Sequence, residues 1–352
     1  MHIGLDYFPA ATHAPGVGRY ARELARALVE LGHGEELRLL ELGRAPQVMS
    51  EASLGLGPAV RRRRLGLPAR LGSAAAHLGL GAEAWLGGVD LFHHVRLHGP
   101  PVRRAPQTLA VSDWPAAAAE AAFLRRLEAF DALFVFCEGY RARLVERAGR
   151  DPRRVHLVPV GADHWLRDLG RDPGELEPAS PPRVLVLGAA QPHRRHAEVL
   201  AACERLLAGG RELSLCFAGS RAEDPTRLAQ RVADSTLGAR VEWCAPREEE
   251  LPELVARSSL LVHLAGDAGT AVTPLEALLL ETPVLVSPLP AFREALGERA
   301  SYFAGGGAPE LADAIEAALA RGARPEAGAA EAFSWRANAA ATRRAWSAIL
   351  EA

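Results

Sequence analysis

The sequence predicts an α/β protein made of two Rossmann-like αβα domains that face each other across a cleft. The first observation is the length of 352 residues, since single hydrophobic cores stop growing near ~250–300 residues. The second is an alternation of strand-like and helix-like runs, which is typical of parallel sheets covered by helices. The third is a Pro-rich polar stretch at 164–183, after which the alternation restarts. Ligands of such sheets bind beyond the carboxyl ends of the strands, so we expect the site in the cleft.

In the first half, short apolar runs predict strands, and runs with apolar residues at helical spacing predict helices. The clearest helix is GRYARELARALVELG, which ends at Gly32. Residues 44–88 have the least regular pattern and contain four consecutive arginines at 61–64. The predicted strands are 2–8, 37–42, 89–94, 108–113, 132–137 and 155–161, and the predicted helices are 18–32, 123–130 and 139–149.

The second half repeats the same alternation. The patterns divide the chain into a first domain at 1–165, a linker at 166–182 and a second domain at 183–332. The predicted strands are 183–188, 213–219, 241–245 and 260–265, the predicted helices lie near 196–208, 225–235, 251–258, 309–320 and 333–350, and the stretch 269–287 contains one helix and one strand.

Composition excludes several classes of function. The net charge of −2 gives no basic field for nucleic acid. The chain has no lysine, so anion binding falls to arginine. The cysteines form no C-x-x-C pair, which argues against a zinc site or a redox pair, and we expect free buried thiols in a reducing cytoplasm. We find no signal peptide, no apolar run of ~18 residues and no metal-binding motif.

The stretch GTAVTPLEALLLETPVLVS, residues 269–287, allows two interpretations of Glu276. Thr273 and Glu276 fit the capping box [ST]-x-x-E, with Pro274 at the first helical position. Alternatively, Glu276 is a ligand-binding residue, because a helix start preceded by Gly269, Thr270 and Thr273 offers backbone N–H groups to an anion.

Other candidate residues lie where predicted strands end. PGVGRYA, with Gly16 and Gly18, fits a dinucleotide fingerprint poorly, because PAATHA separates it from the first strand, and it suits a phosphate or sugar contact or a plain loop. Arg194 and Arg195 begin a helix where a phosphate clamp is expected, although such pairs are often solvated. Four further candidates end two strands of the first domain, namely His93, His94, Ser112 and Asp113, with packed histidines and a capping carboxylate as the alternatives.

Seven segments in this order resemble the family-four glycosyltransferases of the GT-B fold. They are PGVGRYARELARAL, the strands DLFHH and TLAVSD, FDALFVFCEGYRARLVERAGRDPRRVHLVPVGAD, VLVLGAAQPHRRHAEVL, AGTAVTPLEALLLETPVLVSPLPAFREALG and FSWRANAAATRRAW. The last resembles the family's closing helix, which implies that residues 333–352 cross back to the first domain.

The resemblance implies a metal-independent, retaining sugar transfer from a nucleoside-diphosphate sugar, with no other cofactor. It implies that Arg194, with Arg195 beside it, and the helix start at Thr273 stabilise the departing diphosphate, an electrostatic role. Glu276 would bind the ribose. Gly16 and Gly18 would let the first domain approach the donor. We assign catalytic roles to Asp113 and Arg194, and acceptor-side positions to Ser112, His93 and His94.

Three positions depart from the family pattern. The first of its two motif glutamates falls on Ala268, so neighbouring Asp267 is expected to replace it. A donor-loop arginine falls on Ala189, and a histidine before Asp113 is Ser112. These losses leave two alternatives beside an active transferase: a donor-binding, inactive partner subunit, or an oxidoreductase with two nucleotide-type folds.

The acceptor is expected to be a glycan or a lipid-linked molecule. The four arginines at 61–64, flanked by leucine and valine, also suggest that residues 54–72 contact anionic membrane at its cytoplasmic face. Glycines and prolines interrupt this segment, so a solvated loop or helix face is the alternative.

Overall fold

The structure, a computed structural model, describes residues 1–12, 16–32, 34, 36–45, 55–56, 60–67, 80–190, 194–219, 225–322 and 329–351. The chain forms two compact units. Unit 1 comprises Met1–Gly161 and Ser334–Ala352, and unit 2 comprises Ala162–Phe333. The C-terminal helix therefore belongs to the first unit.

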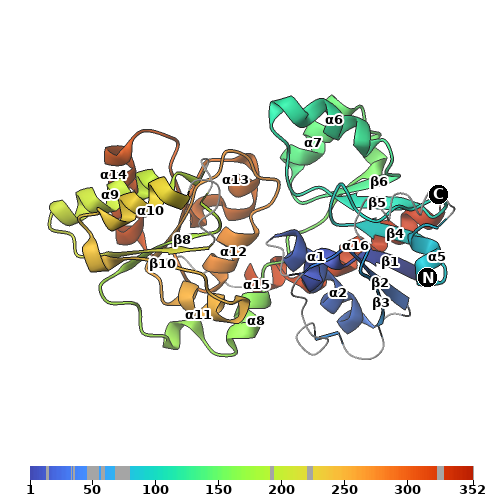
Figure 1. Ribbon diagram of the computed structural model, residues 1–352, viewed down its shortest axis with the longest axis horizontal. Helices are drawn as coiled ribbons and strands as arrows, with labels where there is room; N and C mark the ends of the chain where they lie inside the picture. Colours follow the sequence, from blue (N-terminus) through green and yellow to red (C-terminus); the bar gives the residue numbers. More distant parts are fainter. Residues whose placement is uncertain are drawn as a thin grey trace. The chain divides into compact units, whose positions relative to one another are not determined.

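Unit 1 contains a seven-stranded, fully parallel sheet in the order β3-β2-β1-β4-β5-β6-β7 (Figure 1). Its strands are β1 (His2–Asp6), β2 (Glu36–Leu42), β3 (Arg61–Leu65), β4 (Leu91–His94), β5 (Gln107–Ala110), β6 (Ala132–Val135) and β7 (Val155–Leu157). Its helices are α1 (Phe8–Ala11), α2 (Val17–Leu31), α5 (Ala82–Leu86), α6 (Ala117–Leu127), α7 (Glu138–Ala148) and α16 (Trp335–Glu351).

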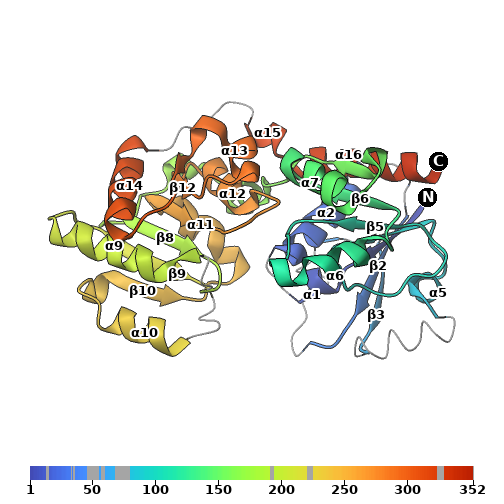
Figure 2. The same ribbon diagram turned by 90° about the horizontal axis from the view of Figure 1, so that it is seen from above.

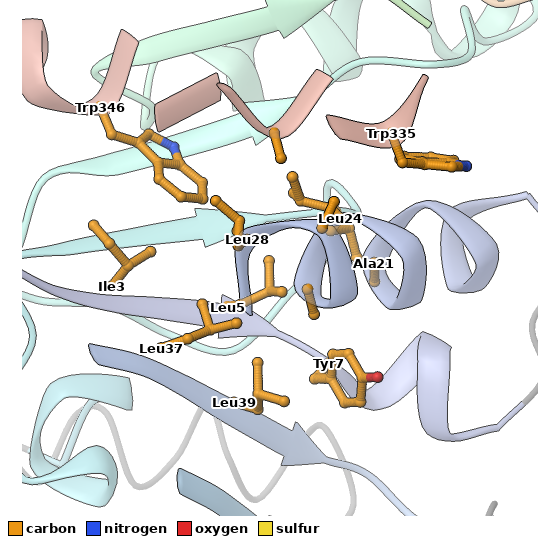
Figure 3. Packing of buried hydrophobic residues seen from close by; sticks show 14 of the residues in the cluster. Ile3, Leu5, Tyr7, Ala21, Leu24, Leu28, Leu37, Leu39, Trp335 and Trp346 are labelled. Carbon is orange, nitrogen blue, oxygen red and sulfur yellow. The ribbon is translucent and has the colours of Figure 1, made fainter. Parts of the chain in front are cut away.

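Alternating side chains of this sheet supply two cores, because successive residues of a strand point to opposite faces. Leu39 packs with α2 and α16, and its neighbour Leu40 packs with α5 on the other face. Figure 3 shows the first core, in which Trp335 and Trp346 of α16 lie over Leu24 and Leu28 of α2. The closing helix is thus part of the first unit's hydrophobic core.

Unit 2 contains a six-stranded parallel sheet in the order β10-β9-β8-β11-β12-β13. Helices α9 and α14 lie side by side on one face, over a core of valine and leucine side chains (Figure 2). The strands are β8 (Arg183–Leu187), β9 (Ser214–Ala218), β10 (Val241–Cys244), β11 (Leu260–His263), β12 (Val284–Val286) and β13 (Ser301–Tyr302). The helices are α8 (His164–Leu169), α9 (His196–Ala208), α10 (Pro225–Ala233), α11 (Leu251–Ala256), α12 (Val272–Leu279), α13 (Pro290–Leu296), α14 (Ala308–Arg321) and α15 (Ala329–Ala332).

These two parallel sheets confirm the predicted fold class, but three local predictions differ. The first strand ends at Asp6 rather than at residue 8, and α1 begins at Phe8. The expected linker, 166–182, lies within unit 2 and contains part of α8 and a 3-10 turn at Pro173–Glu175. A backbone bond from Ala179 N–H to the Arg257 carbonyl (2.8 Å) ties this segment to the residues that follow α11.

The third difference is the arginine run, which forms strand β3 rather than a loop or helix face. It pairs with β2 in parallel, so that Glu41 lies opposite Arg64. The Arg62 guanidinium contacts the carboxylate of Glu41 at 2.5 Å, and Arg61 contacts that of Glu36 at 2.9 Å. Acidic side chains of β2 therefore neutralise arginines that alternation alone could not assign to a strand.

Candidate functional site

Each sheet has one switch point, where the chain leaves two neighbouring strands toward opposite sides. In unit 2 this point lies between β8 and β11, because β9 and β10 extend the sheet on one side and β12 and β13 on the other. In unit 1 it lies between β1 and β4. Ligands of open α/β sheets bind at the carboxyl ends of strands at such points, so the side chains at these two edges are the first candidates.

Arg194 occupies the switch point of unit 2. Its Nη1 donates a hydrogen bond to the Leu187 carbonyl at 3.1 Å and lies 3.5 Å from Nδ1 of His263, the last residue of β11. The guanidinium lies against Gly188, where an added Cβ would come within 3.1 Å of its central carbon. One guanidinium thus spans the ends of both central strands.

Glycines bring the neighbouring backbone close to this guanidinium. Gly188 has a φ of +105°, in the region that favours glycine, and follows β8 directly. A Cβ on Gly219, which follows β9, would lie 2.4 Å from the Gly188 carbonyl oxygen. The ends of β8 and β9 can therefore approach each other this closely only because glycine occupies both positions, 188 and 219.

Arg195 points to different partners. Its guanidinium forms an ion pair with Glu198, donates to the Gly306 carbonyl at 2.5 Å and lies over the Phe303 ring, 5.1 Å from its centroid. These contacts fasten the start of α9 to the segment after β13. Of the two predicted arginines, the structure places Arg194 at the strand ends and Arg195 in contacts within unit 2.

The loop from β11 to α12 contains the predicted donor-binding stretch. The N-cap of α12 is Ala271 and has no side-chain bond, so the predicted capping box is wrong: Thr273 lies inside the helix, and Pro274 is not its first residue. The Thr270 hydroxyl is buried and has no hydrogen-bond partner among the described residues. Asp267 is exposed in the same loop.

Glu276 is fully buried in α12, and its Oε1 lies 3.3 Å from Nε2 of His164 at the start of α8. His164 is also buried and lies beside the ring of Trp165. Sequence analysis missed His164 because it begins the Pro-rich polar stretch at 164–183. The sequence signal for packing against a core is the adjacent Trp165, a large apolar residue in a polar stretch. In the structure Trp165 is 1% exposed.

The switch point of unit 1 holds an ion pair that the sequence did not reveal. The guanidinium of Arg96 contacts both carboxylate oxygens of Asp6, at 2.7 Å and 3.1 Å. Asp6 is fully buried, and burial raises its pKa although Arg96 opposes the shift. Gly16, with a φ of +67°, caps α2, and Gly18 lies buried in its first turn. The two charged groups at this switch point, the Asp6 carboxylate and the Arg96 guanidinium, therefore contact each other.

His93 and His94 lie in the interior of unit 1. Nδ1 of His93 is 2.8 Å from the Thr108 hydroxyl, and its Nε2 is 3.2 Å from the Tyr20 hydroxyl. Burial lowers the pKa of both imidazoles to about 3, so both are neutral. The structure therefore places both predicted acceptor-side histidines in the core.

Ser112 and Asp113 follow β5 and contact each other, with the Ser112 hydroxyl donating to the Asp113 carboxylate at 2.9 Å. Asp113 is exposed. Within the described ranges, no group of three or more His, Cys, Asp or Glu could hold a metal ion. Over the same ranges, no helix has both the length and the apolar character needed to cross a membrane.

Comparisons with known proteins point to one kind of enzyme. Residues 172–335 match the family model of the glycosyl transferases group 1. A stretch of 144 residues is 30% identical to the serotype-specific mannosyltransferase WbdA of Escherichia coli, covering 40% of this chain and 18% of that protein. The chain thus spans about a fifth of the length of these curated relatives.

Among solved structures, Anabaena Alr3699/HepE in complex with UDP and glucose matches with a TM-score of 0.69 and 14% identity, over 100% of this chain and 99% of that one. Sucrose-phosphate synthase from Thermosynechococcus elongatus matches with a TM-score of 0.66 and 17% identity, over 100% and 96%. At these identities the likeness concerns the fold alone.

Proposed function

We propose that this chain, whose residues 172–335 match the group 1 glycosyl transferases and whose two sheets have the GT-B fold, transfers a sugar from a nucleoside-diphosphate sugar to a glycan or lipid-linked acceptor. We further propose that the sugar keeps its anomeric configuration and that the transfer needs no bound metal ion. The relatives include a mannosyltransferase and a protein bound to UDP and glucose. A nucleoside-diphosphate mannose and UDP-glucose are therefore the first donors to test.

The observation that carries the proposal is the position of Arg194. Its guanidinium lies over Gly188 at the switch point of unit 2, the place where this class of sheet binds ligands. A guanidinium binds phosphate oxygens through paired hydrogen bonds. In the proposed reaction Arg194 stabilises the negative charge that develops on the departing diphosphate. The backbone N–H groups at the start of α12 would contribute to the same field.

Other donor contacts are assigned to the loop before α12 and to its interior. The buried Thr270 hydroxyl would bond to the donor, and the exposed Asp267 would replace the missing carboxylate at Ala268. Glu276 is the proposed ribose ligand. Because its carboxylate is buried beside His164, contact with ribose requires the residues that cover it to move.

In unit 1 we assign the acceptor-side role to Asp113. Its exposed carboxylate follows a central strand and is oriented by the Ser112 hydroxyl. A carboxylate in this position would accept the proton of an acceptor hydroxyl. His93 and His94 are buried and are not part of the proposed acceptor site. Gly16, at the start of α2, would allow a close backbone approach to the substrates.

A donor-binding protein without transferase activity is the second candidate. It is favoured by Ala268, whose methyl group cannot hydrogen-bond the hydroxyls of a donor sugar. Each missing hydrogen bond to a charged group weakens transition-state binding by roughly 1.5–3 kcal/mol. Donor binding and sugar transfer must therefore be measured separately.

The test begins with a thermal-shift panel of UDP-, GDP-, TDP- and ADP-sugars, with and without EDTA. A ligand that binds the native state raises the melting temperature, and we expect one nucleotide to do so in EDTA. Mass spectrometry then detects product on candidate acceptors, and NMR of its anomeric proton reports retention. If no nucleotide shifts the melting temperature, the proposal is wrong. Binding without product on any acceptor, and without donor hydrolysis, favours the second candidate.

Membrane contact through residues 54–72 is a further part of the proposed partner set, of which only 55–56 and 60–67 are described. Arg61, Arg62 and Arg64 contact carboxylates of β2, which lowers the positive charge available to anionic lipid. Arg61→Ser/Arg63→Ser leaves both contacts with Glu41 in place. Co-sedimentation with phosphatidylserine vesicles at low salt should fall in this variant, and absence of binding by the parent chain would remove the membrane from the proposal.

A further inference from the structure

Two cysteines of unit 2 lie side by side on neighbouring strands. Cys216 is in β9 and Cys244 is the last residue of β10, and their sulfur atoms are 3.4 Å apart. In the strand register Cys216 lies opposite Glu242, so Cys244 is its diagonal neighbour on the same face of the sheet. This face is opposite to the one that carries α9, because Leu215 and Phe217 pack into the core under that helix.

The two thiols differ in their surroundings. Cys216 is fully buried, whereas Cys244 is half-buried at the end of an edge strand. We assign the shared hydrogen to the buried Cys216, which donates to the Cys244 sulfur. This hydrogen bond raises the pKa of Cys216, and burial acts in the same direction. It lowers the pKa of Cys244 by more than burial and the Glu242 carboxylate raise it, and the nearby Arg183 guanidinium also lowers it.

These features resemble the arrangement of an attacking and a resolving thiol. The thiolate is the nucleophile in cysteine chemistry, and it must be reached by the oxidant. Cys244 has the lower pKa and the greater exposure of the two, and Cys216 lies within contact distance to react with its oxidised form. Sequence spacing gave no sign of this pair, because the residues are separated by a helix and a crossover between parallel strands.

We propose that Cys216 and Cys244 form an oxidisable dithiol that a peroxide converts to a disulfide. The Cys244 thiolate attacks one peroxide oxygen, giving a sulfenic acid and releasing hydroxide, which becomes water after protonation. The Cys216 sulfur then attacks the sulfenic sulfur, the S–S bond forms, and the sulfenic oxygen leaves as a second water with the Cys216 proton. Two thiols are oxidised by two electrons, and one peroxide is reduced to two waters.

Closing the bond requires the sulfur atoms to approach from 3.4 Å to about 2.05 Å. The strand that moves is β10, because it lies at the edge of the sheet and pairs only with β9 among the described strands. Its Cys244 carbonyl accepts a hydrogen bond from Gly219 N–H at 2.9 Å. Through this bond the dithiol is linked to Gly219, whose backbone is in close contact with Gly188. Gly188 is the residue against which the Arg194 guanidinium lies.

The other two cysteines provide matched controls. Cys203 is buried in α9, and burial raises its pKa to about 12. Cys137 is buried in unit 1, where its sulfur accepts a hydrogen bond from Tyr140 N–H. Neither thiol combines exposure with a neighbouring sulfur, so both should stay reduced under conditions that oxidise Cys244.

The experiment treats the reduced, folded full-length chain with hydrogen peroxide and maps its peptides without reduction. We expect one linked peptide pair containing Cys216 and Cys244, lighter by two hydrogen atoms and reversed by dithiothreitol. Cys203→Ser should leave this linkage unchanged. In Cys216→Ser, dimedone should trap a sulfenic acid at Cys244.

Three results would overturn the proposal. The first is that both thiols remain free in the folded chain after peroxide treatment. The second is that the linkage forms only after unfolding in urea. The third is that dimedone labels Cys216 in Cys244→Ser but fails to label Cys244 in Cys216→Ser, which would reverse the assigned order. None of these results depends on the proposed transfer reaction.

Discussion

The two units use arginine in different ways. In unit 1, Arg96 is paired with the buried carboxylate of Asp6, and Arg62 with that of Glu41. In unit 2, Arg194 lies over a glycine and contacts a carbonyl oxygen and an imidazole. The carboxylates of unit 1 hold their guanidiniums inside the folded unit, whereas the guanidinium of Arg194 lies where an open α/β sheet binds its ligand. The first arrangement serves folding, and the second is suited to an anionic ligand.

This difference separates the expected effects of substitutions. In unit 1, loss of an arginine that pairs with a buried carboxylate should lower the free energy of unfolding and leave nucleotide affinity unchanged. At the edge of unit 2, loss of Arg194 should lower affinity and leave stability nearly unchanged. Both the free energy of unfolding and the nucleotide affinity are therefore measured for each variant.

The largest effect is expected for Arg62→Ala. It leaves the carboxylate of Glu41, which is 1% exposed, without its nearest cation. Breaking a buried ion pair typically costs 3–5 kcal/mol, and because Arg64 also lies 3.4 Å from Glu41 we expect a loss of about 3 kcal/mol in unfolding free energy. Urea unfolding measures the loss, and hydrogen exchange should localise it to β2 and β3.

Arg63→Ala is the matched control, because this side chain lies on the same strand and is exposed. Exposed substitutions usually change stability by about 0.5 kcal/mol or less. Equal losses of unfolding free energy for Arg62→Ala and Arg63→Ala would show that the arginines of β3 act only through strand propensity. The contrast between the two units would then lose its main support.

The second effect concerns pH and the buried His93. Its pKa is about 3 in the folded protein against a usual value of 6.5. The unfolded chain therefore binds a proton that the folded chain excludes, so stability is fully present above pH 6.5 and falls as the pH drops toward 3. At pH 5 the loss is about 2 kcal/mol, since each pKa unit corresponds to about 1.4 kcal/mol.

Hydrogen exchange of β4 and β5 at pH 7 and pH 5 measures this dependence within unit 1. His93→Gln keeps a polar group near Thr108 and Tyr20 but cannot titrate. We expect its pH dependence to be roughly half that of the parent chain, because His94 has the same lowered pKa. An unchanged dependence would mean that His93 is not the group that takes up the proton on unfolding.

These two predictions rest on features that sequence patterns reveal unequally. The alternation of strands and helices predicted both sheets, and the helix expected near 196–208 is α9, His196–Ala208. Such regular segments are predictable because one periodicity determines which residues are buried. Strand β3 was missed because its stability depends on Glu36 and Glu41 of another strand, a pairing that no local pattern contains.

The candidate site shows the same limit. The position of Arg194 followed from its place after an apolar strand, and Arg195 was assigned the same role because adjacent residues look alike in sequence. Their contacts distinguish them, because Arg195 pairs with Glu198 one turn further along α9 and reaches Phe303 and Gly306 elsewhere in unit 2. The capping box failed for a different reason: Thr273 and Glu276 have the required spacing, but α12 begins before them. Spacing identifies the motif and not the residue at which the helix starts.

The third effect separates the two neighbouring arginines of unit 2. Arg194→Ala should weaken binding of a nucleoside diphosphate by roughly 10–100-fold, since hydrogen bonds to charged groups contribute about 1.5–3 kcal/mol. Binding of the nucleoside alone should change little. Arg195→Ala should leave both affinities nearly unchanged, because its guanidinium is held by Glu198 and Gly306. Calorimetry on each variant decides the matter, and equal losses for the two ligands would exclude a phosphate role for Arg194.

The smallest effect is expected for Glu276→Gln. Glu276 fits neither the paired arginines of unit 1 nor the position of Arg194 in unit 2. Its carboxylate is buried like those of unit 1, yet it is assigned to the donor like Arg194. Glutamine keeps the side-chain volume and the contact with His164, so the melting temperature should hardly change. Loss of the charge should weaken nucleoside binding by about 1 kcal/mol, roughly fivefold. His164→Phe keeps an aromatic ring beside Trp165 but removes the nitrogen that contacts Glu276, so a similar loss of affinity in that variant would show that His164 orients the carboxylate. If Glu276→Gln instead lowers stability and leaves the affinity intact, Glu276 is an internal partner of His164, and α12 contributes only its backbone to the donor site.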